Sequence, residues 1–228
     1  MRKLKLFLTM LMTTAVFFTN GLMAQNEESE KPSKFSPGAD FYSNFIWRGS
    51  KAGTGPAFQP YLEFATGGLT LGAWGSFDAS GYAETDVYAT FDFSFGLSLG
   101  ITDYYLSDLD YFDYSDSTGS HAFELTAGYA IKGLSLSANY ILNEAGGIES
   151  AGGDVYLEAG YAFDNVSIFV GAGNGWYTSD GEFAVCNVGI GMEKEIKITD
   201  SFSVPVSGQL VLNPEKKGLF VVLGFSLQ

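Results

Sequence analysis

An alternation of apolar and polar residues with a period of two runs along the chain from residue 38 to residue 228. Segment 134–140 shows it most clearly, because leucine, alanine and tyrosine occupy every second position and serine and asparagine lie between them. Successive side chains of a β-strand point to opposite faces of the sheet, so this pattern predicts strands with one apolar and one polar face. A sustained helical spacing of apolar residues is not found here. The chain is therefore predicted to be all-β.

Short and long connections alternate between the predicted strands. The longer connections are 49–55, 107–118, 143–152 and 176–182, and most of the others are tight turns. An even number of strands of about 9–11 residues, with short turns at one end and longer loops at the other, is typical of transmembrane β-barrels. The twelve predicted strands are 38–48, 56–66, 68–79, 84–95, 97–106, 119–131, 133–142, 153–164, 165–175, 183–195, 201–212 and 217–228.

A soluble sandwich or lipocalin-like barrel would alternate in the same way, with its apolar side chains turned inward. The membrane alternative is favoured because the apolar faces carry almost no charge, which falls instead on the opposite faces and in the loops. Aromatic residues also lie near strand ends on the apolar faces, as an interfacial girdle requires. We therefore predict an antiparallel up-and-down transmembrane β-barrel. The girdle candidates are Trp47, Phe64, Phe77, Phe163, Phe202 and Phe225.

The first residues have the pattern of a secretory signal. A basic start is followed by the apolar stretch 6–18 and by small residues up to Ala24, which predicts a signal peptide over residues 1–24 that is cleaved on export. Gln25 follows the expected cut, so a lipid-anchored lipoprotein is not expected. Residues 25–37 are polar and predict a flexible lead-in before the barrel at 38–228. Together these features predict the outer membrane of a Gram-negative cell.

Composition argues against several classes of function. The chain has 26 acidic residues against 12 lysines and arginines, with a formal net charge of −14. Such a balance disfavours a nucleic-acid partner, which needs a basic face to neutralise phosphates. One cysteine and one histidine leave little material for a disulfide, a zinc site or a catalytic triad. We expect no enzymatic activity, no cofactor and no bound metal.

Three sequence segments in the first third of the chain resemble the TorF family of porins. They are S-N-F-I-W-R-G at 43–49, P-A-F-Q at 56–59 and G-A-W-G-S-F-D at 72–78. The resemblance implies an outer-membrane barrel with a channel role, in a family whose function is otherwise unknown. Three departures are visible. Phe45 stands where the family usually has tyrosine, the chain ends in Gln228 rather than an aromatic residue, and Pro60 predicts a bulge in the second strand.

Other motifs have a more ordinary interpretation. His121 is expected at the outer rim on the lipid face, without the serine two residues later that an outer-membrane phospholipase would need, since that position is Phe123. Cys186 shares the apolar face of its strand and is expected to be a packing residue. The acids of loop 107–118 lack the glycine and closing glutamate of a calcium-binding loop, so they are expected to be solvated. These acids are Asp108, Asp110, Asp113 and Asp116.

The polar faces would line the lumen. Arg48 is the one clear base among the charged residues expected there. A twelve-strand barrel lies between eight-strand barrels filled by side chains and open porins of 16–18 strands. Composition alone therefore allows either an open lumen or one packed shut by hydrogen-bonded acids. The candidate lumen-lining residues are Arg48, Glu63, Asp86, Asp92, Glu124, Asp154 and Glu158.

Two functions follow from these alternatives. The first is a porin-like channel for passive diffusion of small neutral or cationic solutes. The second is a structural or surface-interaction barrel with a closed lumen, acting through outer loops such as 107–118. In either case the expected partners are outer-membrane lipid and the barrel-assembly machinery, with small solutes for the channel. The sequence leaves the oligomeric state open.

Overall fold

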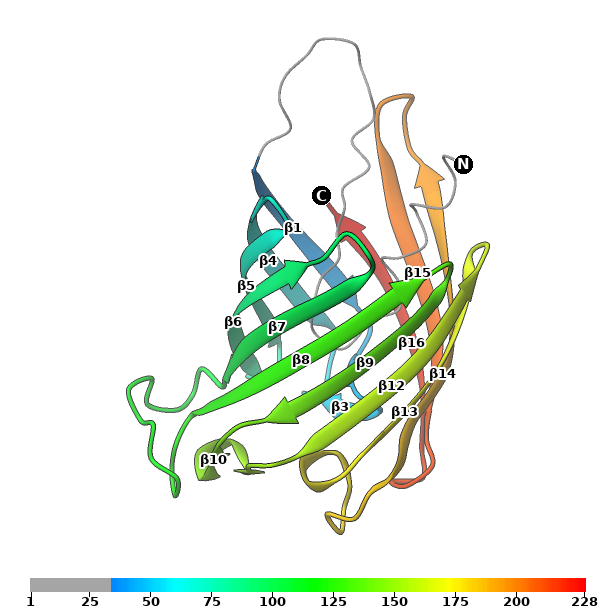
Figure 1. Ribbon diagram of the computed structural model, residues 1–228. Coiled ribbons are helices and arrows are strands. Elements are labelled where there is room, and N and C mark those ends of the chain that lie inside the picture. Colours follow the sequence, from blue (N-terminus) through cyan, green and yellow to red (C-terminus); the bar gives the residue numbers. More distant parts are fainter. Residues whose placement is uncertain (1–33) are drawn as a thin grey trace.

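Twelve antiparallel strands close into a barrel in the computed structural model, which describes residues 34–228 (Figure 1). Each strand pairs with the next in order around the wall, and β1 closes the barrel on β16. The predicted fold class is confirmed; the signal peptide and the lead-in up to residue 33 lie outside the described residues. The wall strands are β1 (Phe35–Tyr42), β4 (Ala57–Thr66), β5 (Leu69–Asp78), β6 (Ala83–Asp92), β7 (Leu97–Tyr105), β8 (His121–Ile131), β9 (Leu134–Ile141), β12 (Val155–Phe163), β13 (Val166–Gly173), β14 (Ala184–Lys197), β15 (Ser203–Asn213) and β16 (Gly218–Leu227).

The two ends of the barrel differ. Short turns and the C-terminus lie at one end, called here the short-turn end, and the longer connections lie at the other, called the long-loop end (Figure 1). A helix with the length and hydropathy needed to cross a bilayer is absent from residues 34–228. The small elements of the longer connections are β2 (Phe45–Trp47), β3 (Ser50–Ala52), β10 (Glu144–Ala145), the 3-10 helix η2 (Gly146–Ile148), β11 (Ser150–Ala151) and the 3-10 helix η3 (Gly175–Tyr177).

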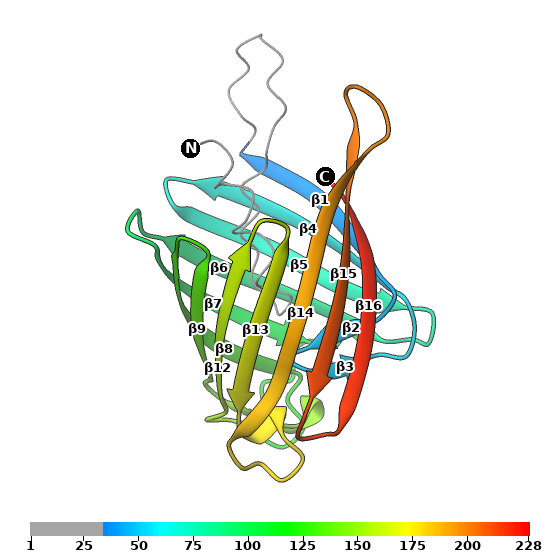
Figure 2. The ribbon, with the colours of Figure 1, turned by 90° about the vertical axis from the view of Figure 1, so that its right-hand side faces the viewer.

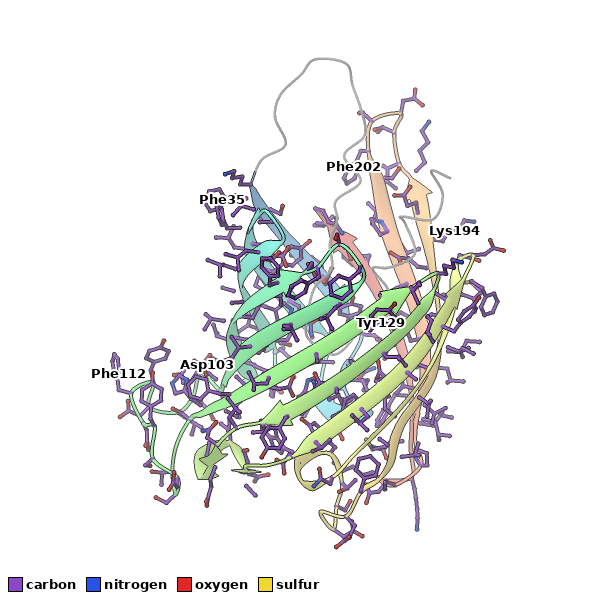
Figure 3. All side chains as sticks on the ribbon, in the orientation of Figure 1. Phe35, Asp103, Phe112, Tyr129, Lys194 and Phe202 are labelled. Atoms are coloured by element: carbon purple, nitrogen blue, oxygen red, sulfur yellow. The ribbon has the colours of Figure 1, made fainter. Side chains whose placement is uncertain are left out.

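The outer surface of the wall is apolar and the inner surface is polar. On β9, Leu136 and Tyr140 are exposed, whereas Asn139 between them is buried. On β8, Leu125 is exposed and Glu124 is fully buried. Figure 3 shows the outward side chains standing off the ribbon all along the wall. This is the reverse of a soluble barrel, and it is the arrangement of a sheet whose outer face meets hydrocarbon.

The first predicted strand, 38–48, is wrong at both ends. β1 begins at Phe35 and leaves the wall after Tyr42, because the chain turns at Ser43. The Ser43 backbone N–H donates to the carbonyl of Leu223 on β16, and the Ser43 hydroxyl oxygen, in place of the backbone carbonyl, accepts the Leu223 N–H. Trp47, predicted in the lipid-facing girdle, therefore does not lie on the wall. The segment 49–55, predicted as an outer loop, folds into the lumen with it.

A bulge exists, but in a different strand from the one predicted. Pairing between β4 and β5 keeps one register on both sides of Pro60, so the proline removes a donor without adding a residue. The register instead shifts between β13 and β14, next to Gly171. This shift turns Cys186 inward, where it is fully buried, while Val185 faces outward. The expectation that Cys186 lies on the apolar outer face is therefore wrong.

Several inward aromatic rings lie flat on the wall. The ring of Tyr61 covers Gly38, its partner across the β1–β4 ladder, and the ring of Tyr88 covers Gly72 across the β5–β6 ladder. A Cβ atom on either glycine would collide with the ring that covers it. The rings therefore run along the wall instead of projecting towards the barrel axis. Phe169 over Gly189 and Tyr42 over Gly224 repeat the arrangement.

Candidate functional site: the lumen and the inward hairpin

Residues 43–56 form a hairpin that folds into the lumen at the long-loop end, and we call this segment the inward hairpin. β2 and β3 are its two arms, with Trp47 paired to Ser50 across the turn. Arg48 and Gly49 occupy the turn with positive φ angles of 47° and 82°. Two successive positive φ angles are those of the tight hairpin turn whose twist matches paired strands. Figure 2 shows β2 and β3 within the outline of the barrel.

The inward hairpin reaches opposite walls. Successive side chains of a strand point in opposite directions, so neighbouring residues of β2 meet different parts of the barrel. Phe45 packs in one cluster with residues of β4, β5 and β6. Ile46 packs in another, with residues of β13, β15 and β16. The hairpin therefore lies across the lumen instead of resting on one side.

Hydrogen bonds fix the tip and the base of the inward hairpin. At the tip, the side-chain amide of Asn213 donates to the carbonyl of Gly49 at 3.1 Å. Gly49 also lies against the backbone of Cys186, where no Cβ atom would fit. At the base, the Asp78 carboxylate accepts the backbone N–H of Thr54 at 2.7 Å. The hairpin is thus tied to β15, β14 and β5.

Arg48 makes the strongest of these contacts. Its two terminal nitrogens donate to the two carboxylate oxygens of Glu124 on β8, at 2.5 and 2.8 Å. Nη1 also donates to the hydroxyl of Tyr177 at 2.6 Å, and the hydroxyl of Tyr104 donates to Glu124 at 3.0 Å. Arg48 is 2% exposed and Glu124 is fully buried. A paired two-point contact of this kind is strong and specific in geometry.

Aromatic rings surround the same guanidinium group. Its central carbon lies 4.9 Å from the ring centre of Trp47, 4.6 Å from that of Tyr156 and 5.1 Å from that of Tyr177. The faces of aromatic rings attract cations through their quadrupole, and they exclude water. The Arg48 guanidinium is therefore enclosed by these three rings and paired with the Glu124 carboxylate, and we call this arrangement the cage. The sequence placed Arg48 at the end of a wall strand, whereas it is the tip of the inward hairpin.

The predicted lumen residues are all on the inner side, but they do not form one group. Glu158 lies near the cage, because it accepts the hydroxyl of Tyr156 at 2.5 Å and the side-chain amide of Asn187 at 3.0 Å. Glu63 accepts the hydroxyl of Tyr88 at 2.7 Å on a separate part of the wall. Tyrosine hydroxyls are thus the usual partners of these carboxylates.

The remaining predicted acids are less fully paired. Asp86 on β6 and Asp154 before β12 are 2% and 3% exposed, and each has one carboxylate oxygen without a hydrogen-bond partner. Asp92 is half-buried at the short-turn end of β6, away from the inward hairpin. A buried polar atom without a partner is costly unless water or a solute contacts it.

Sequence reasoning missed several residues around the inward hairpin. Glu84 lies on the same inner face as Asp86, and this two-residue spacing was a usable signal. Tyr104 and Tyr177 carry no charge, and nothing in the strand pattern ties them to Arg48. Trp176 lies in η3, within the β13–β14 connection, where the strand periodicity carries no information.

His121 faces outward, as predicted, but it is covered. Its Nδ1 lies 2.9 Å from the Asp103 carboxylate and its Nε2 lies 2.6 Å from the carbonyl of Tyr111. The rings of Tyr105 and Tyr114 stack on it, at 5.1 and 4.5 Å between centres. The side chain is therefore buried under the loop between β7 and β8, whose Phe112 projects away from the barrel (Figure 3).

The acids of that loop organise its own turns. The Asp113 carboxylate accepts hydrogen bonds from the backbone and hydroxyl of Ser115 and from the hydroxyl of Thr118. These bonds favour the ionised form and lower the pKa of Asp113. Asp110 accepts the backbone N–H of Phe112 at 3.1 Å. Within residues 34–228, acids, histidine and cysteine are nowhere grouped in threes for a metal ion.

Comparisons with known proteins place the chain in a family without an assigned function. No curated protein matches it. A triple mutant of the Rhodopseudomonas blastica porin is similar over 75% of this chain, with 17% identity and a TM-score of 0.40. Another mutant of the same porin gives 17% identity and a TM-score of 0.39. This chain spans 55% of the length of those porin chains. Residues 26–202 match the family described as bacterial proteins of unknown function (Gcw_chp), and the chain belongs to that family.

Proposed function

We propose that the protein is an outer-membrane channel for small cationic or neutral polar solutes, with a lumen narrowed by the inward hairpin. The apolar outer wall supports placement in a membrane, and the predicted signal peptide supports export to the outer membrane. The polar inner wall supports a pathway for solutes.

The acidity of the lumen is the observation that carries this proposal. Arg48 forms an ion pair with Glu124, so this pair adds no net charge to the lumen. Glu84 and Glu158 have hydroxyl or amide donors as partners, and Asp86 has an oxygen without any. Carboxylates between low-dielectric walls focus a negative potential, which raises the local concentration of cations and excludes anions.

The inward hairpin favours a second candidate function, a barrel with a closed lumen. Its two faces pack on opposite walls, and its tip is held by the buried pair of Arg48 and Glu124. A barrel of this kind would act through its outer loops, such as the one that covers His121. The two candidates differ in one measurable property, the passage of ions.

Reversal potentials across a planar bilayer under a KCl gradient test the channel. We expect the natural protein to prefer K⁺ over Cl⁻, more strongly at low salt, where screening is weak. Asp86→Asn combined with Glu158→Gln should reduce this preference. Asp116→Asn is the matched control, because it removes a charge from an exposed loop position. An anion preference, or one that the double variant leaves unchanged, would contradict the proposed pathway.

Replacement of residues 45–52 by two glycines separates the two candidates. This change removes Phe45, Trp47 and Arg48 but keeps the wall strands β1 and β4. If the hairpin narrows a channel, the natural protein conducts and the shortened variant conducts several-fold more. If the lumen is closed, the natural protein does not conduct and only the shortened variant does.

A further inference from the structure

A hollow of about 360 Å³ lies at the long-loop end, between the inward hairpin and the wall. Its size is within the range of small-molecule sites in proteins. Its lining comes from β2 and β3 of the inward hairpin, from the wall between Tyr82 and Leu106, and from η2 and η3 with the residue after η2. The lining residues that matter here are Phe45, Trp47, Tyr82, Glu84, Tyr104 and Trp176.

The ionisable side chains in and beside the hollow are mostly acids. Glu84 is 9% exposed, and its carboxylate accepts only the hydroxyl of Tyr82, at 2.6 Å, among the side-chain contacts of the described residues. Asp86 lies two positions along the same inner face and has an oxygen without a partner. Glu149 also lines the hollow. Lys51 lines it too, but its ammonium group donates to the carbonyl of Thr54 at 3.2 Å and pairs with no carboxylate there.

The protein already holds one of its own cationic side chains between aromatic rings and a carboxylate. The guanidinium of Arg48 is held by the rings of Trp47, Tyr156 and Tyr177 above the carboxylate of Glu124. The hollow has the same two ingredients, aromatic rings and a buried carboxylate. Trp47 belongs to both, since it contacts Arg48 and also lines the hollow.

The aromatic lining of the hollow favours an organic cation, because the faces of aromatic rings attract alkylated ammonium groups. An inorganic cation would not use the aromatic lining, and residues 34–228 offer no grouping of ligands for a metal ion.

We propose that this hollow binds a small organic ammonium ion. The rings contact the alkylated cation, and Glu84 supplies the opposite charge. The assignment rests on the proposed function in one respect, because it names the class of cationic solute that enters the barrel. Binding to the hollow at the long-loop end can nevertheless be measured without any transport.

Equilibrium binding of choline chloride to the full-length protein in detergent tests the site. Isothermal titration gives the affinity, and tryptophan fluorescence, to which Trp47 and Trp176 contribute with Trp74, gives a second signal. The neutral tert-butyl isostere of choline has the same shape without the charge. We expect it to bind about tenfold more weakly or worse, as the loss of one cation–π and charge contact of about 1.4 kcal/mol predicts.

Variants identify the residues. Glu84→Gln keeps the shape of the side chain and should weaken choline binding about tenfold, while Trp176→Leu should weaken it to a similar degree. Asp116→Asn controls for general charge, because Asp116 is exposed in the β7–β8 loop and does not line the hollow, so it should leave the affinity unchanged.

Three results would overturn the inference: no saturable choline binding, equal binding of the isostere, or a methyl glucoside that binds more tightly than choline. Choline binding without conductance would retain the site and reject the channel. Conductance without choline binding would retain the channel and reject the site. The two proposals therefore fail independently.

Discussion

The aromatic residues inside the barrel have different partners in two regions. At the long-loop end, the rings of Trp47, Tyr156 and Tyr177 pack around Arg48. Along the wall, rings such as Tyr61 and Tyr88 lie flat on glycines. Tyr156 and Tyr177 also lie on wall glycines, Gly171 and Gly173, so the two regions share this packing. What differs is that the rings at the long-loop end contact a buried cation as well.

The largest loss of stability should come from removing the cationic side chain of Arg48. We expect Arg48→Met to lower the free energy of unfolding in urea by about 3–5 kcal/mol, because Glu124 would remain buried without its partner. Arg48→Met combined with Glu124→Leu should recover most of the loss, since no unpaired charge then remains. Lys197→Met is the control. It breaks the exposed pair with Asp200, which is 2.6 Å long, and such pairs contribute about 0–1 kcal/mol. Equal losses from Arg48→Met and Lys197→Met would contradict the role given to the cage.

The next effect separates the lumen from the outer wall. Ala138 is exposed on the outer face of β9, and Ser137 faces inward opposite Glu158. Ala138→Arg should cost about 2–4 kcal/mol in lipid, whereas Ser137→Arg should cost much less, because a carboxylate lies across the ladder. Unfolding of both variants in phospholipid vesicles measures the difference. Equal costs would mean that the two faces are exchanged or that the sheet is not in lipid.

A smaller effect tests the flat rings. Gly72→Ala should cost about 1–3 kcal/mol, because its methyl group would displace the ring of Tyr88 towards the axis. Gly208→Ala is a matched control on β15, where the added carbon would meet only Leu223 at an ordinary 3.4 Å. If channel currents are observed, Gly72→Ala should also reduce them. Identical behaviour of the two variants would show that the glycine is not needed by the ring.

The smallest effect lies outside the barrel, in the β7–β8 loop. Hydrogen bonds from Ser115 and Thr118 lower the pKa of Asp113 below its ordinary value of 3.8. The ionised form therefore stabilises the loop above pH 3.8, and this contribution is lost as the pH falls through the lowered pKa. Amide signals of Ser115 in a nuclear magnetic resonance titration should move with that transition. Asp113→Asn should loosen the loop at neutral pH, and Asp116→Asn should not.

The wall was predictable because it depends on local pattern. A strand such as β9 shows its two faces in the order of its residues, and β1 to β16 close the barrel with that same period. The inward hairpin was not predictable in this way. Phe45 and Trp47 continue the alternation of β1, so the sequence resembles a longer strand. What turns the chain inward is a set of distant partners, of which Glu124 is the main one.

The candidate site shows the same division. The inner position of Glu124 and Glu158 follows from strand parity, but parity cannot show that Arg48 pairs with the first and not the second. The inward position of Cys186 depends on a shift in register that no turn residue marks. Local pattern thus defines which face a residue belongs to, and long-range packing defines which residues meet.

The long-range contacts of the inward hairpin also determine when it can reach its final position during folding. Arg48 and Glu124 are 76 residues apart, and Gly49 and Asn213 are 164 apart. The second contact cannot form until β15 is in place, although the hairpin itself is near the start of the described chain. Contacts of such high sequence separation form slowly and late, because chain entropy must be lost first. Substitutions at Arg48 should therefore speed unfolding while leaving the folding rate almost unchanged.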